Sequence, residues 1–153
     1  MDVAARQVVV TALAELARSP DHRDRADAGR GLAAFADLPV ARDVLLDLVL
    51  DAGDTFVPPA TTEALLRHGD AAGLAIVCAG VATAECERLD RLYAAVHSVL
   101  GAFEHDRDAA VVTCRGLLDD TAQTEQVRAG ATRLIAVLTE LRPPLDAAQD
   151  ATT

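Results

Sequence analysis

Histidine is the side chain most often used for proton transfer and metal binding near neutral pH, and this chain contains four. They are His22, His68, His97 and His105. None belongs to a ligand pattern, since the chain has no His-x-x-x-His, no Cys-x-x-Cys and no His-Glu dipeptide. The run 104–106 brings Glu, His and Asp together, but at a predicted helix junction, where capping explains them. We therefore expect no metal site and no cofactor.

The three cysteines, Cys78, Cys86 and Cys114, are the candidate nucleophiles. A thiol becomes a nucleophile when a base or a positive charge lowers its pKa. Arg115 adjoins Cys114, but successive residues on a helix point about 100° apart, so the guanidinium does not face the thiol. Cys78 and Cys114 fall in apolar helical runs and are interpreted as small hydrophobic core residues.

The remaining candidates for catalysis are paired carboxylates and glycine-rich loops. The carboxylate pairs stand at 43 and 47, at 106 and 108, and at 119 and 120, and a solvated helix face or a cap explains each. The serines and threonines show no nucleophile-elbow pattern, and no glycine cluster resembles a phosphate-binding loop. We therefore predict that the protein is not an enzyme and that it has no catalytic residues.

Helical periodicity dominates the whole chain, and the alternation typical of strands is nearly absent. In the first helix, polar residues at 6, 11, 15 and 18 predict one stripe that faces water. Eight helices are expected, at 2–18, 22–36, 38–50, 56–68, 70–82, 84–103, 106–119 and 122–142.

Capping and helix-breaking residues mark the boundaries of these helices. Asp21 is predicted to cap the second helix, and Asp37 to cap the third, with Pro39 in its first turn. Gly69 is predicted to end the fourth helix in the left-handed conformation, directly before Asp70 caps the fifth. The connections are so short that successive helices must run antiparallel.

Several residues recur at a period of 33 to 36. A shift of 33 places Asp21, Leu32, Asp37 and Val44 on Asp54, Leu65, Asp70 and Val77. A shift of 36 then places Asp70, Cys78 and Gly80 on Asp106, Cys114 and Gly116. Two helices of 12 to 14 residues with their turns fill such a period, so the repeating unit is a helix pair.

The run 54–60, Asp-Thr-Phe-Val-Pro-Pro-Ala, followed by Glu63-Ala-Leu-Leu66 and Gly69-Asp70, resembles the short α-solenoid repeats of the HEAT family in small actinobacterial proteins. The resemblance covers about residues 20–142. It departs from the family pattern at Pro58 and Pro59, which stand near the position of the usual Arg. The resemblance implies a right-handed stack of helix pairs but no particular function, because HEAT-like modules serve many purposes. HEAT-like DNA glycosylases present a basic, aromatic concave face, which this chain lacks.

The composition of the chain indicates which kind of partner it binds and in which cellular compartment it is found. The net charge is −10 and aromatic residues make up 3% of the chain, which opposes binding to nucleic acid or to anionic membranes and favours a basic protein partner. An odd number of cysteines, an acidic N-terminus and the absence of a ~20-residue apolar run predict a cytoplasmic protein. All 14 cationic residues are arginine and no asparagine occurs, a bias that indicates a GC-rich bacterial genome.

We therefore predict an all-α fold: a right-handed α-solenoid of about three HEAT-like helix pairs, closed at its ends by the helices at 2–18 and 122–142. Residues 1–145 form one domain and 146–153 a disordered polar tail. The predicted function is a non-catalytic protein–protein interaction module. A narrower version is an inhibitor or immunity-type protein that masks a basic partner, and the alternative is an enzyme or small-ligand binder with a pocket between helix pairs.

The second helices of successive pairs line the concave side of a HEAT-like stack. Here these helices, at 38–50, 70–82 and 106–119, offer a strip of small residues with charged edges. Close packing of another helix explains the small residues equally well. The candidate partner-binding residues are Arg42, Asp43, Asp47, Ala75, Ala79, Arg115 and Asp119.

Overall fold

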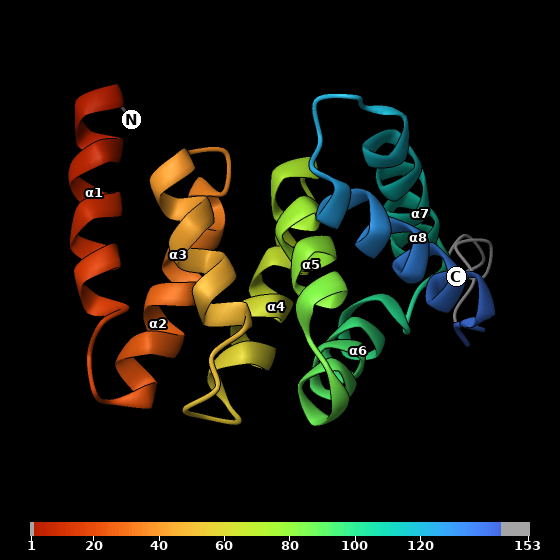
Figure 1. The fold of residues 1–153 in the computed structure, drawn as a ribbon, viewed down its shortest axis with the longest axis horizontal. Helices are drawn as coiled ribbons and strands as arrows, with labels where there is room; N and C mark the ends of the chain where they lie inside the picture. Colours follow the sequence, from red (N-terminus) through yellow and green to blue (C-terminus); the bar gives the residue numbers. More distant parts are fainter. Residues whose placement is uncertain (1, 145–153) are drawn as a thin grey trace, which may run out of the picture.

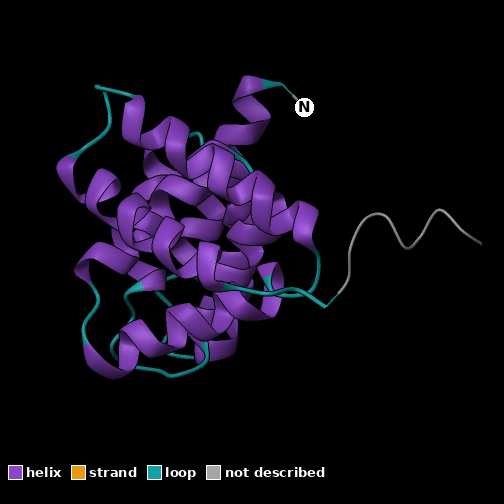
Figure 2. Cartoon of the chain, turned by 90° about the vertical axis from the view of Figure 1, so that its right-hand side faces the viewer, coloured by secondary structure: helices purple, strands orange, loops and turns teal. Residues whose placement is uncertain are grey.

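A computed structural model describes residues 2–144, and this part of the chain is all-helical, with no strand (Figures 1 and 2). The predicted all-α class is confirmed. The elements are α1 (Val3–Leu16), α2 (His22–Leu32), the short 3₁₀ helix η1 (Ala33–Phe35), α3 (Pro39–Val49), α4 (Val57–His68), α5 (Ala71–Thr83), α6 (Cys86–Leu100), α7 (Glu104–Asp119) and α8 (Glu125–Glu140). The tail predicted at 146–153 lies outside the described residues.

The helices begin and end within three residues of their predicted bounds, except that α2 ends at Leu32, four residues early, where the chain continues as η1. Most of the local capping signals are correct. The carboxylate of Asp21 accepts a hydrogen bond from the backbone N–H of Arg23 at 2.8 Å. Gly69 adopts φ 68° after α4, a left-handed conformation that glycine tolerates without steric cost. Asp70 then caps α5 by accepting from the N–H of Gly73 at 2.7 Å.

The prediction that Asp37 caps the third helix is wrong. Leu38 is the residue that precedes Pro39, the first residue of α3, so Asp37 stands one position too early to cap it. The side chain of Asp37 instead accepts two hydrogen bonds from the guanidinium of Arg6, at 2.8 and 3.0 Å.

This ion pair also takes Arg6 out of the predicted water-facing stripe of the first helix, of which Thr11, Glu15 and Arg18 are exposed as expected. Arg6 was expected to face water, but it lies against the ring of Phe35, 5.6 Å from the ring centroid. The exposed surface of α1 also includes Val3 and Val8, whose exposed fractions are 77% and 68%. The partner of Arg6 is 31 residues away, so the pattern within α1 could not show which way that side chain points.

The helices form two layers, with α1 at one end of the molecule and α7 and α8 at the other (Figure 1). Contacts join α1 to α3 and α3 to α5 in one layer, and α2 to α4 and α4 to α6 in the other. α8 continues the first layer by packing against α5, and it also contacts α7. The helix predicted to close the far end therefore packs mainly against the middle of the chain.

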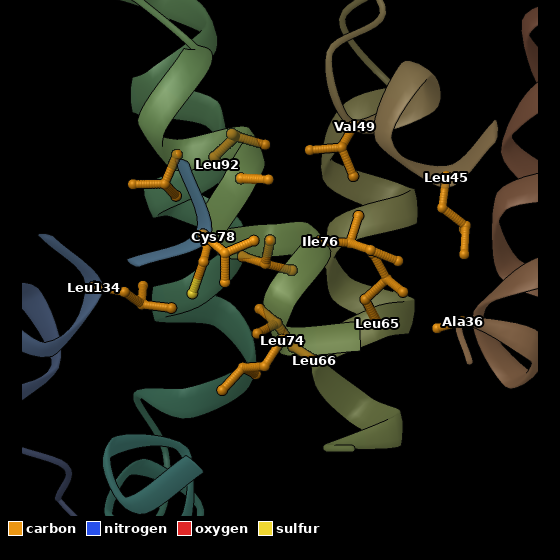
Figure 3. Packing of buried hydrophobic residues seen from close by; sticks show 14 of the residues in the cluster. Ala36, Leu45, Val49, Leu65, Leu66, Leu74, Ile76, Cys78, Leu92 and Leu134 are labelled. Carbon is orange, nitrogen blue, oxygen red and sulfur yellow. The ribbon is translucent and has the colours of Figure 1, made fainter. Parts of the chain in front are cut away.

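The core is centred on α5, which contacts α3, α4, α6, α7 and α8. Leucines from these neighbours surround it, among them Leu45, Leu92 and Leu134 (Figure 3). α8 approaches closely because Gly130 has no side chain: a Cβ at this position would overlap the backbone carbonyl of Cys78. On another side of α5, a Cβ at Gly80 would lie only 2.6 Å from Cγ1 of Val49. Small residues on α5 and α8 therefore set the distances between the central helices.

Candidate interaction groove

A hollow of about 380 Å³ lies between α3, the middle helix α5 and the start of α8. We call it the interaction groove. Its floor is formed by α5, one wall by α3 and the other by the end of α7 with the α7–α8 connection and the first turn of α8. The lining residues are Arg42, Asp43, Leu46, Ala71, Ala72, Ala75, Ile76, Ala79, Leu117, Ala122, Gln123, Thr124, Gln126 and Val127.

The structure brings four of the seven predicted partner-binding residues together in this groove. Arg42 and Asp43 lie on the α3 wall, and Ala75 and Ala79 lie on the floor. The floor residues follow from the sequence, since positions 72, 75, 76 and 79 share one face of a helix. Ala79 is almost fully buried, whereas Ala75 is half-buried and accessible from the groove.

The other three predicted residues lie elsewhere. Asp47 lines a separate hollow against the end of α1 and the start of α2. Arg115 and Asp119 are exposed on α7 but do not line the groove. The expected concave strip is also narrower than predicted, because α8 covers α5 next to Cys78 and because Gly80 packs beneath α3. Close packing of another helix therefore explains the small residues beside α8 and α3, and a docking strip stays a prediction for the side of α5 that lines the groove.

The wall at 122–127 was missed by the sequence analysis. Two local caps shape it: Asp120 accepts from the backbone N–H of Ala122 at 2.9 Å, and Thr124 accepts from the N–H of Val127 at 3.2 Å. Two hydrogen bonds to the carboxylate hold the pKa of Asp120 below its usual value: the larger effect comes from the backbone N–H of Ala122 and the smaller from the side-chain amide of Gln123. These caps are visible in the sequence, but their position beside α5 depends on where α8 packs.

The segments that form the groove carry an acidic excess. Ranges 39–49, 70–83 and 117–127 contain one arginine and six acids, hence half of the net charge of −10. Asp70 and Asp120 serve as caps. Within residues 2–144, the other four acids have no ion-pair or hydrogen-bond partner, and neither has the Arg42 guanidinium. The four acids are Asp43, Asp47, Asp119 and Glu125. The groove thus has a largely apolar floor, and its lining includes one acid and one base that are unpaired in the described part of the chain, Asp43 and Arg42; the other unpaired acids lie on the surrounding segments outside its lining.

A second hollow, of about 420 Å³, lies between the C-terminal ends of α4 and α6 and the start of α7. It is where a small ligand would fit best by size. Of its charged groups, Arg67 pairs with Glu63 at 2.9 Å, and a carboxylate oxygen of Asp106 lies 3.1 Å from Nε2 of His105. Among the described residues, no group of three or more His, Cys, Asp or Glu side chains is placed to hold a metal ion. The hollow is therefore large enough for a small ligand, but among the described residues no set of functional side chains converges on it.

None of the helices within residues 2–144 is both long and apolar enough to cross a membrane. In the comparisons with known proteins, no family model, no curated protein and no solved structure matches this chain.

Proposed function

We propose that this protein is a non-catalytic protein-binding module and that its interaction groove receives a basic helix of a partner protein. The observation that carries the proposal is the floor of the groove. It is formed by small residues of α5, the same helix that accepts α8 on its adjacent side.

The packing of α8 supports a helix as the ligand. Where two helices meet, the distance between their axes depends on the side chains at the contact, and small residues permit the shortest distances. The floor contains alanine at 71, 72, 75 and 79, with Ile76 and Leu46 adding larger apolar surface at its edge. Such a floor between two walls fits the apolar ridge of an amphipathic helix.

The charge distribution supports a basic partner. Asp43 lines the groove, and the acids at 47, 119 and 125 lie on the same three segments outside it; none has a positive partner within residues 2–144, so this negative charge attracts a cationic helix toward that side of the molecule. Asp43 lines the groove itself, beside Arg42, which supplies one donor for a carboxylate or a carbonyl of the ligand. Apolar contact on the floor with opposite charges at the rim matches the usual anatomy of a protein interface.

We propose further that the helix pairs α2–α3, α4–α5 and α6–α7 are HEAT-like repeats in a right-handed stack. The contacts of α2 with α4, α4 with α6, α3 with α5, and α5 with α7 support this arrangement. In this reading α8 is an addition that fills part of the concave side, and the interaction groove is the part that α8 leaves open.

The test compares two variants with the same change of charge. Ala75→Arg places a long cationic side chain on the floor of the groove, whereas Ala129→Arg places it on an exposed position of α8 that does not line the groove. The probe is a labelled synthetic amphipathic helix of about 18 residues, with arginine on one face and leucine and alanine on the other. Binding is followed by fluorescence anisotropy in ~150 mM salt, and a probe with glutamate in place of arginine serves as the control.

We expect the wild type and Ala129→Arg to bind the basic probe equally, and Ala75→Arg to bind at least ~10-fold more weakly. Because Ala75 is half-buried, melting temperatures are measured for all variants, and Gln126→Arg repeats the test from an exposed residue of the wall. Equal binding by all four proteins would show that the groove is not the site. Failure of the wild type to prefer the basic probe would refute the basic helical partner.

A further inference from the structure

Arginine side chains cap the carboxyl ends of helices in this protein. Arg107, on α7, donates to the carbonyl oxygen of Leu141 at the end of α8, at 3.1 Å. Arg133, on α8, donates to the carbonyl oxygen of Val81 in the last turn of α5, at 3.2 Å. The last four carbonyl groups of a helix have no partner within that helix, so a guanidinium from a neighbouring helix satisfies some of them.

The same kind of contact occurs at the two other helices of the first layer. Nη1 of Arg88, on α6, lies 3.5 Å from the carbonyl oxygen of Leu50, the residue that ends α3. Arg25, on α2, donates to the carbonyl oxygens of Ser19 and Pro20 in the turn that follows α1, at 3.1 and 3.0 Å. Each of the helices α1, α3, α5 and α8 therefore has an arginine of another helix at or just beyond its carboxyl end.

Three of these arginines share a position in their own helices. Arg25 is the fourth residue of α2, Arg88 the third of α6 and Arg107 the fourth of α7. Where two neighbouring helices run antiparallel, the beginning of one lies beside the end of the other. An arginine in the first turn can then reach the carbonyl groups of its neighbour's last turn, so this position is typical of an antiparallel contact.

Arg42 has this position but no such contact. It is the fourth residue of α3 and lines the interaction groove, and within residues 2–144 its guanidinium has no hydrogen-bond or ion-pair partner. Arg128, the fourth residue of α8, is also unpaired in the described part of the chain, but it is exposed and does not line the groove. Arg42 is therefore the first-turn arginine that borders the space where a further helix is proposed to bind.

The three helices around the groove run in the same direction. Val49, near the end of α3, lies against Gly80, near the end of α5, and Arg133 of α8 also reaches the last turn of α5. At the opposite end, first-turn residues of all three helices line the groove. The groove thus borders the beginnings of α3, α5 and α8, where the helix dipoles are positive. The carboxyl end of an antiparallel ligand helix, which is the negative end of its dipole, is favoured there.

We propose that Arg42 caps the ligand: the partner helix lies antiparallel to α5, and the guanidinium of Arg42 donates to the backbone carbonyl groups of its last turn. This orientation rests on the proposed function, which supplies the helix. Carbonyl groups are the acceptors, rather than the carboxylate of a chain end, because the arginines at the ends of α1, α3, α5 and α8 all meet carbonyl oxygens. Asp43, which also lines the groove, then faces a cationic side chain of the same last turn, where positive charge is favoured.

The first experiment determines the orientation of the bound helix. The probe is the basic amphipathic helix used above, acetylated and amidated so that neither end is charged. One version carries a nitroxide amino acid at its amino end and another at its carboxyl end, about 25 Å apart along the helix. In the full chain labelled with ¹⁵N, we expect the carboxyl-end label to broaden most strongly the amide signals of residues 40–44 and 71–73. The amino-end label should broaden most strongly the signals of residues 79–83.

The second experiment removes the capping group. Arg42→Met keeps the aliphatic stem and removes the donors and the charge, and Arg128→Met is the matched control. We expect Arg42→Met to bind the amidated probe about 3- to 10-fold more weakly than the wild type, and Arg128→Met to bind it equally. The direction of the effect is informative, because loss of a positive charge would by itself strengthen the binding of a cationic probe.

The outcomes separate the orientation from the proposed function. The reverse pattern of broadening, or the same pattern from both labels, would overturn the orientation and leave the groove as a site for a basic helix. Binding by Arg42→Met as tight as that of the wild type, or tighter, would overturn the capping role. A wild type that binds neither version of the probe would refute the proposed function, and the orientation would fall with it.

Discussion

The packing of α8 on α5 can be tested with a single methyl group at Gly130. In Gly130→Ala the new Cβ would overlap the carbonyl oxygen of Cys78, which belongs to the backbone of a central helix and cannot rotate away. α8 must therefore move outward along its contact with α5. Overpacking of this kind costs about 1–3 kcal/mol and sometimes more, and the clash with backbone favours the upper part of that range.

Part of this cost is offset in the unfolded state. Alanine is about 0.5–1 kcal/mol more favourable than glycine within a helix, because glycine loses more conformational freedom on folding. The net loss in the free energy of unfolding is therefore about 2 kcal/mol. For a chain of this size it corresponds to a fall in melting temperature of roughly 4–8 °C.

Gly116 provides a matched control, because a Cβ there would meet nothing within 4 Å. Gly116→Ala should therefore show only the preference of alanine over glycine within a helix, and it should raise the free energy of unfolding by about 0.5–1 kcal/mol. Both variants are compared with the wild type by urea and thermal unfolding, followed by circular dichroism. The reasoning is refuted if Gly130→Ala is as stable as the wild type while Gly116→Ala is stabilised as expected.

Three further predictions concern polar groups. Thr62 is fully buried and its hydroxyl has no hydrogen-bond partner within the described residues, so Thr62→Val should raise the free energy of unfolding by about 1 kcal/mol in urea titrations; a loss of stability would show that the hydroxyl is satisfied. Asp51 forms a half-buried ion pair with Arg25 at 2.9 Å and also accepts a hydrogen bond from the backbone N–H of Gly53, so Asp51→Asn should lower the free energy of unfolding by about 2 kcal/mol. Asp27→Asn, which breaks an exposed ion pair, should lower it by less than about 0.5 kcal/mol, and equal effects of the two variants would contradict the role of burial. The pKa of Asp54 is lowered because two backbone N–H groups at the start of α4 donate to its carboxylate. A lowered folded-state pKa contributes stability that is fully present above the ordinary value of 3.8 and is lost as the pH falls through the folded-state pKa. The melting temperatures of wild type and Asp54→Ala should therefore differ at pH 7 and approach one another as the pH falls below 3.8; a constant difference would exclude this linkage.

Two of the three parts of the interaction groove could be predicted from the sequence. Its floor and its α3 wall could be predicted, because Ala75 and Ala79 share a helix face and Arg42 and Asp43 lie on the second helix of the preceding predicted pair. Its second wall could not be predicted, because it is formed by a connection whose position depends on α8. The expectation that α8 merely closes the far end placed that wall outside the site.

Local sequence determined the helices of this protein and most of their boundaries. Apolar periodicity, the caps at Asp21 and Asp70, and the glycine at 69 act within a few residues, so they have the same effect wherever the helix finally packs. The repeat of 36 residues stays a prediction, since Asp70 caps α5 whereas its predicted counterpart, Asp106, lies inside α7.

Only the tertiary structure decided how these helices pack and which faces remain exposed. Arg6 pairs with a carboxylate 31 residues away, and Gly130 lets α8 lie against the backbone of Cys78, 52 positions earlier in the chain. Contacts of this range depend on fits between surfaces formed by several helices at once, and neither partner's local sequence carries a signal for the other. The interaction groove exists because α8 covers one side of α5 and leaves the adjacent side open.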